Sequence, residues 1–178
     1  MRKLAVLLLA LPLCAFAQEK KQPPTDLRGV LLEQLHSTNS AEDWFVPVAT
    51  AIDGVTAEQA QWKPTGKDAH SVGQLAYHIW YWDTYMLAQF KGQKPEKFDG
   101  NNNETFDKFS PGQWDDLAKK LKQEMADWET AVQNASDADL AKGASLIAHI
   151  GAHRAYHVGQ ILYVRKLQGS WDPKKGVK

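Results

Sequence analysis

The segment AHRAYHVGQI, residues 152–161, decides the fold and the candidate site of this chain. Its two histidines, His153 and His157, are four residues apart, which places both on one face of a helix, one turn apart. Two imidazoles held in this way can converge on one metal ion from a rigid backbone. A third histidine, His78, lies in a second helical segment, residues 71–90. If the two helices pack side by side, the three imidazoles form a site with coordination positions open for water or substrate, as in catalytic metal sites.

The rest of the chain predicts an all-α fold. Four stretches carry apolar residues at helical spacing, and neither a strand pattern nor an internal repeat is apparent. Four long amphipathic helices in 178 residues predict one domain, a four-helix bundle with a long loop between the second and third long helices. The helices are expected from residue 26, over residues 71–90, from residue 111 and over about residues 144–167, with residues 92–110 as the loop.

Start and stop signals set the expected helix boundaries. The first helix either breaks near residues 37–40 or continues to Ile52 with a kink at Pro47. The other signals are an N-cap at Asp26, capping boxes at Thr56/Gln59 and Ser71/Gln74, an N-cap and first-turn proline at Ser110/Pro111, and a stop at Gly169.

The N-terminus is typical of a secretory signal peptide. A positive start is followed by an apolar run, residues 4–13, too short to span a bilayer, and by the small-residue site Ala15-Phe16-Ala17. A lipid anchor on Cys14 is the alternative, which the large Leu13 disfavours. We therefore expect an exported protein, periplasmic or secreted. The expected parts are a signal peptide (1–17), a flexible lead-in (18–25), the bundle (26–170) and a C-terminal tail (171–178).

Composition excludes several classes of function. The formal net charge is zero and the pI about 7.0, with scattered Lys and Arg residues, so no nucleic-acid partner is expected. Cleavage would remove Arg2, Lys3 and the single cysteine, leaving 19 basic against 21 acidic residues and no disulfide or thiol nucleophile. The mature chain is expected not to insert stably into a membrane. A homodimer is compatible with such a bundle, although no stripe identifies its interface.

Packing alone can also account for each candidate side chain. His149 extends the His153/His157 stripe by one turn, and apolar neighbours make hydrogen-bonded core histidines the alternative to a metal site. Two histidines at ligand spacing with a third on another helix favour the metal. Aromatic residues near His78 are first interpreted as core packing, but Tyr81 or Tyr85 can border a pocket. His36 and His70 have no partner at ligand spacing and are interpreted as structural or surface residues.

Three segments resemble the DinB-like metal-binding proteins. They are SVGQLAYH (71–78), HRAYHVGQI (153–161) and the linker TAEQAQWKP (56–64), and the resemblance covers residues 27–168 in order. It implies a four-helix bundle that holds a divalent metal ion. By position the implied ligands are His78, His153 and His157.

The resemblance also implies roles around the ligands. His149 would line the pocket or contact one of the metal-binding histidines. Gln160 can orient a ligand imidazole or brace the helices. Gly159 would permit close helix approach, although helix packing without a functional role also explains it. Many members of the family carry another histidine where this chain has Ala155-Tyr156. This departure changes the pocket wall rather than the set of ligands, and we expect Tyr156 to line the pocket. The predicted export is the second departure.

A three-imidazole site leaves most of the charge of a divalent ion uncompensated, which acidifies bound water. Zinc is the default ion, and nickel, iron or manganese also fit. Glu104 or Asp83 can act as a general base only if the fold brings it close. One interpretation is a metal-dependent hydrolase or a thiol-dependent transferase, the latter disfavoured because low-molecular-weight thiols are mainly cytosolic. The others are a non-catalytic metal or small-ligand binding protein, or a bundle without metal.

Overall fold

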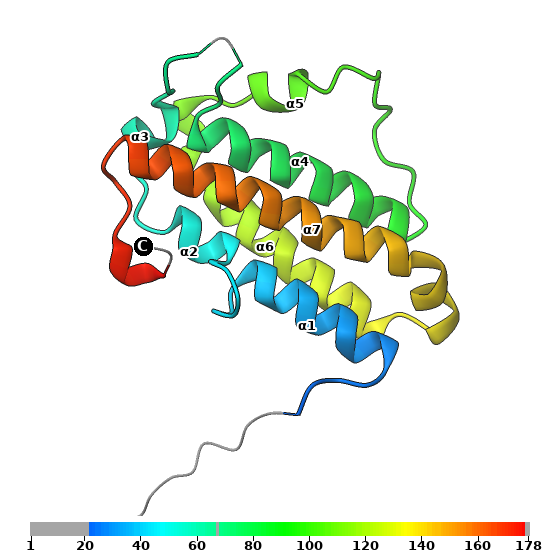
Figure 1. Ribbon diagram of the computed structural model, residues 1–178. Helices are drawn as coiled ribbons and strands as arrows, with labels where there is room; N and C mark the ends of the chain where they lie inside the picture. The colour runs from blue at the N-terminus through cyan, green and yellow to red at the C-terminus, as the bar shows by residue number, and fades with distance from the viewer. Residues whose placement is uncertain (1–21, 67, 177–178) are drawn as a thin grey trace, which may run out of the picture.

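The computed structural model describes residues 22–66 and 68–176, and within this part of the chain it contains helices and no strands (Figure 1). The all-α class is thereby confirmed for the described residues. The predicted signal peptide (1–17) and part of the predicted lead-in (18–25) lie outside them. The α-helices are α1 (Leu27–Asn39), α2 (Val48–Ile52), α3 (Ala57–Gln61), α4 (Val72–Phe90), α5 (Glu104–Asp107), α6 (Trp114–Asn134) and α7 (Asp137–Leu167), with 3₁₀-helices η1 (Pro111–Gln113) and η2 (Pro173–Lys175).

The four longest helices pack in a closed ring. α1 packs against α6 and α7, and α4 packs against the same two helices (Figure 1). Residues 91–113 connect α4 to α6 and include α5, which packs on α4. The helices that carry the three histidines, α4 and α7, are therefore direct neighbours.

A buried polar layer separates two apolar clusters of the core. On α4, Asp83 lies four residues after Ile79 of one cluster and four before Leu87 of the other. Arg154 occupies the equivalent position on α7, and its Nε donates to Asp83 Oδ2 at 2.7 Å with both side chains fully buried. Arg154 Nη1 also donates to Asn39 Oδ1 at 2.5 Å, at the end of α1. One polar network thus joins α1, α4 and α7 next to the histidine-bearing turn.

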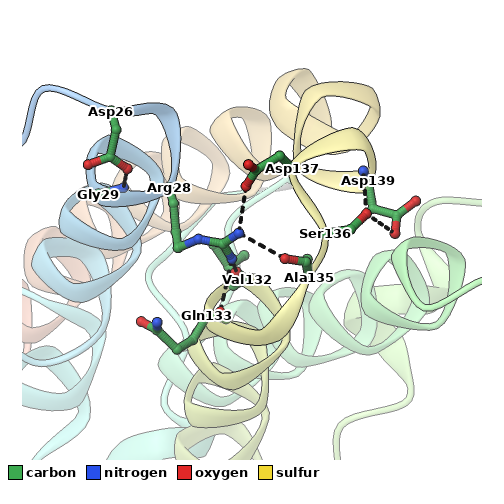
Figure 2. A network of polar contacts seen from close by, with 9 residues as sticks. All are labelled: Asp26, Arg28, Gly29, Val132, Gln133, Ala135, Ser136, Asp137 and Asp139. Atoms are coloured by element: carbon green, nitrogen blue, oxygen red, sulfur yellow. Dashed lines mark hydrogen bonds and ion pairs between the residues drawn. The ribbon is translucent and has the colours of Figure 1, made fainter.

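Arg28 connects the start of α1 to the junction between α6 and α7 (Figure 2). Its guanidinium donates to the backbone oxygens of Val132, Gln133 and Ala135 at 2.7 to 2.9 Å, and to Asp137 Oδ1 at 2.9 Å. The last carbonyls of a helix have no partner within the helix. Arg28 supplies one, and so holds three helices together at this end of the molecule.

The capping signals of the sequence place most helix starts correctly. Both predicted capping boxes form, and Asp26 accepts from the Gly29 amide. The first helix breaks after Asn39, which decides between the two alternatives.

Two predicted helix starts are wrong. α7 begins at Asp137 rather than near residue 144, because Ser136 caps it and Leu140 adds a buried anchor to an otherwise polar first turn. Ser110 makes no side-chain cap bond, and Pro111 opens a 3₁₀ turn instead of the third long helix.

Close approach of helices occurs at a glycine other than the predicted one. A Cβ at Gly159 would meet nothing within 4 Å, because this residue faces outward. A Cβ at Gly151 would lie 2.8 Å from Gln34 of α1. The small residue that lets α1 approach α7 is therefore Gly151, and the expectation for Gly159 is corrected.

Candidate metal centre

The structure brings His78, His153 and His157 together where α4 and α7 pack. One potential ligand atom from each imidazole lies within 4.8 Å of the others, and this is the one such His/Cys/Asp/Glu group found among the described residues. The Nε2 atoms of His78 and His153 are 3.1 Å apart. Two nitrogens bound to one tetrahedral zinc ion at about 2.0–2.1 Å lie about 3.3–3.4 Å apart. The spacing therefore suits a shared ion with little rearrangement.

A threonine of the connecting loop fixes the tautomer of His78. Thr105 Oγ1 donates its single proton to the backbone oxygen of Asn102 at 2.6 Å. The same hydroxyl lies 2.6 Å from His78 Nδ1, so it must accept a proton from that nitrogen. His78 Nε2 is left with a free lone pair directed at the other two histidines. Thr105 is buried and stands outside any helical pattern, so no signal in the sequence pointed to this role.

A glutamine on α7 does the same for His157. Gln160 Oε1 lies 2.6 Å from His157 Nδ1, and a carbonyl oxygen can only accept, so Nδ1 carries the proton. The amide nitrogen of Gln160 donates to the Tyr156 hydroxyl at 3.3 Å, which agrees with this orientation. Metal-binding histidines usually donate their second ring N–H to such a partner. His157 Nε2 is thus free to bind an ion.

His153 differs from the other two histidines. Its Nδ1 is buried and has no hydrogen-bond partner among the described residues. Because His78 Nε2 bears a lone pair, the 3.1 Å contact is favourable only if His153 Nε2 carries the proton or if a cation lies between them. A metal ion would replace that proton. The donor set consequently fits a divalent transition metal, for which imidazole is a common ligand.

Burial keeps the three imidazoles neutral. Burial lowers the pKa of His78 to about 3, with smaller contributions from His157 and His153. It lowers the pKa of His153 to about 4, assisted by His157 and Arg154. It also lowers the pKa of His157, although the hydrogen bond with Gln160 opposes the shift. Neutral imidazole is the form that binds metal, so the site is ready for an ion at neutral pH.

The triad lies in the wall of a cavity of about 640 Å³, a size typical of small-molecule sites. The walls come from α4, α5 and α7 and from the loops before α4 and α5. None of the described lining residues is Asp, Glu, Lys or Arg. The lining consists of His70, His78, Trp82, Met86, Asn102, Phe106, Leu146, His149, Ile150, His153, Tyr156, His157 and Gln160.

His70 also lines this cavity, a position that its interpretation as a structural or surface residue did not include. Its ring stacks on Phe106 at 4.1 Å between centroids, and Phe106 stacks on His78 at 3.9 Å. Burial lowers the pKa of His70. Its position in the loop before α4, without helical spacing to the other histidines, concealed the relationship in the sequence.

The other predicted pocket residues divide into two groups. His149, Tyr156 and Gln160 line the cavity with the triad. Tyr81 lines a separate, polar cavity of about 230 Å³ formed by the loop between α4 and α5, and Tyr85 lines neither of these two cavities.

Neither predicted general base reaches the triad. Asp83 is fully buried against Arg154, and Glu104 lies in the 230 Å³ cavity in an ion pair with Lys108.

The fold and the cluster define an all-helical protein with a three-histidine site. A family model described as the DinB superfamily matches residues 48–161, a span of more than half of the chain that includes all three histidines. The chain therefore belongs to the DinB superfamily, as the three sequence segments indicated. The comparisons with curated proteins and with solved structures gave no match. In the described part of the chain, no helix has both the length and the apolar character needed to cross a membrane.

Proposed function

We propose that this protein binds one divalent transition-metal ion through Nε2 of His78, His153 and His157 and hydrolyses a small molecule held in the adjacent cavity. The observation that carries the proposal is the pair of hydrogen bonds that direct two of the three nitrogens, from His78 to Thr105 and from His157 to Gln160. The ring of contacts among α1, α4, α6 and α7 supports a four-helix bundle as the scaffold. A bound ion would supply a Lewis acid at the end of the cavity.

His149 is the proposed proton acceptor. Its Nδ1 lies 2.6 Å from the backbone oxygen of Ser145, so Nδ1 carries the proton and Nε2 keeps a lone pair. The side chain lines the cavity one turn before His153. In ester cleavage the carbonyl carbon forms a bond to the oxygen of water and breaks its bond to the leaving oxygen. His149 would accept the proton of water and return it to that leaving oxygen.

The hydrolase is tested with the metal-loaded protein and p-nitrophenyl butyrate. We expect turnover above that of the free ion, with His149→Gln reducing kcat/KM by about 10²-fold or more at unchanged metal content. Equal rates for the two proteins would remove His149 from the mechanism. A rate no higher than that of the free ion would contradict hydrolase activity toward this class of ester.

A non-catalytic binding protein is the second candidate. It is favoured by the absence of any carboxylate among the described residues of the cavity wall. In that case the metal-loaded protein would bind small chelating ligands with one-to-one stoichiometry and would turn over none of them. Titration calorimetry and a rate assay on the same sample separate the two candidates.

Export is a further part of the proposal and rests on the sequence of residues 1–17. N-terminal sequencing of the protein from its native host should start at Gln18. A chain that retains Met1 after fractionation would contradict cleavage.

A further inference from the structure

We infer that the cavity receives a molecule with one metal-binding polar group and an uncharged, apolar body that lies along the groove between α4 and α7. The inference rests on the proposed metal site and names the class of ligand that this site takes. A hydrolysable ligand of this class is an ester, amide or lactone with an aliphatic or aromatic chain.

The position of the apolar wall gives the direction of the groove. α4 and α7 run antiparallel, since Asp83 pairs with Arg154 and a Cβ at Gly143 would touch Phe90. On α4 the cavity continues from the triad toward the C-terminus of the helix, and on α7 it continues toward the N-terminus. The side chains involved are Trp82 and Met86 on α4, and Leu146 and Ile150 on α7.

The length of the groove follows from these helix positions. Trp82 and Met86 lie one and two turns beyond His78, and Leu146 lies about two turns before His153. Two turns of α-helix measure about 11 Å. The apolar wall formed by these two helices therefore extends about 11 Å from the triad, which suits an elongated body with its polar group at the triad.

The uncharged lining of the cavity disfavours a ligand whose body carries a charge. None of the described lining residues is Asp, Glu, Lys or Arg. A charged group placed in such an environment without a partner loses hydration that nothing replaces.

Three hydroxamic acids test the inference, because the hydroxamate group binds metal and the body can be varied. Acetohydroxamic acid has no body, octanohydroxamic acid has an apolar one, and its ω-carboxy analogue ends in a charge. Calorimetry with the zinc-loaded protein should give octanohydroxamate a Kd at least 30-fold lower than acetohydroxamate. The carboxylate should cancel most of this gain.

A substitution in the wall supplies the matched variant. Leu146→Glu should remove the preference for the octanoyl chain and leave the Kd for acetohydroxamate within about 3-fold of the parent. Leu167→Glu, the same change at an exposed position of α7, should leave both affinities unchanged. A circular-dichroism melt checks whether Leu146→Glu is folded. If the variant does not fold, the three-ligand series on the parent protein still tests the apolar groove.

Each outcome has a separate meaning. Acetohydroxamate that binds as tightly as octanohydroxamate, or a carboxylate that leaves the affinity unchanged, would overturn the apolar groove while leaving the metal site intact. Octanohydroxamate that binds zinc-free protein equally well would overturn the placement of the polar group at the triad. Failure to load zinc would instead contradict the proposed function itself.

Discussion

Arg154 donates from Nε to Asp83 Oδ2 at 2.7 Å, and neither side chain is exposed to solvent. Arg154 follows His153 directly, and Asp83 lies five residues after His78. The ion pair therefore connects the two helices of the histidine triad directly after His153 and more than one turn beyond His78. Burial raises the pKa of Asp83 while Arg154 opposes that shift, so removal of one partner leaves the other in a strongly unfavourable environment.

Removing one partner of this ion pair should destabilise the fold more than replacing both partners together. Asp83→Leu or Arg154→Met leaves a buried charge without a partner, and each should lower the free energy of unfolding by about 3–5 kcal/mol. The double variant should lose less than the sum of the two, as urea denaturation can measure. Additive losses would show that the two side chains do not interact in solution.

Thr105 should control metal affinity without touching the ion. Thr105→Val removes the acceptor for His78 Nδ1–H, and we expect metal affinity to fall by about 10–100-fold. Thr105→Ser keeps the hydroxyl and should stay near the parent value. Competition with a chromophoric chelator measures both, and equal affinities for the valine and serine variants would argue against the hydrogen bond.

The metal-free protein should lose stability as the pH falls. His78 and His153 have folded pKa values of about 3 and about 4, below the unfolded value of about 6.5. Protonation therefore favours the unfolded state, so their contribution is complete above pH 6.5 and is lost between about pH 6.5 and 4 for His153 and between about pH 6.5 and 3 for His78. Each group adds at most about 1.4 kcal/mol per pH unit to the slope. Asp83, with its raised pKa, acts in the opposite direction.

A substitution isolates the histidine part of this slope. In the metal-free protein, His153→Gln should reduce the slope of the free energy of unfolding against pH by the contribution of about one titrating group. Urea midpoints between pH 4 and 7 measure this slope. Parallel curves for the parent and the variant would mean that His153 has an ordinary pKa.

Arg28 should stabilise the end of the molecule remote from the histidines. Arg28→Met removes the partner of three backbone oxygens and should cost about 1–3 kcal/mol, since hydrogen bonds to charged groups are lost. Metal content should not change. Thermal melts and metal analysis of the same sample test both parts, and a loss of metal would show that this end is coupled to the site.

The sequence predicted the parts of this molecule that follow from short-range rules. Helical spacing located α4 and α6, a capping box marked the start of α4, and the four-residue spacing of His153 and His157 placed two imidazoles on one face. The early part of α7 does not follow from such rules, because Leu140 is its only buried side chain before Ile147 and no periodic stripe marks it.

The residues that complete the site depend on tertiary packing. Thr105 and Phe106 lie in a one-turn helix of a long connection, where no periodicity exists to reveal their direction. The distance of Asp83 from His78 along α4 suggests a candidate base, but the opposite helix buries it against Arg154. His70 has no sequence spacing that relates it to the triad, and only the stack on Phe106 brings it to the cavity.

The most direct test of the three-histidine site is elemental analysis of the protein from residue 18, purified without a histidine tag, beside His157→Ala. We predict about one equivalent of a divalent transition metal in the parent and less than about a tenth of that in the variant, with helix content preserved. A parent that holds no metal after reconstitution and dialysis, or a variant that retains a full equivalent, would contradict the site.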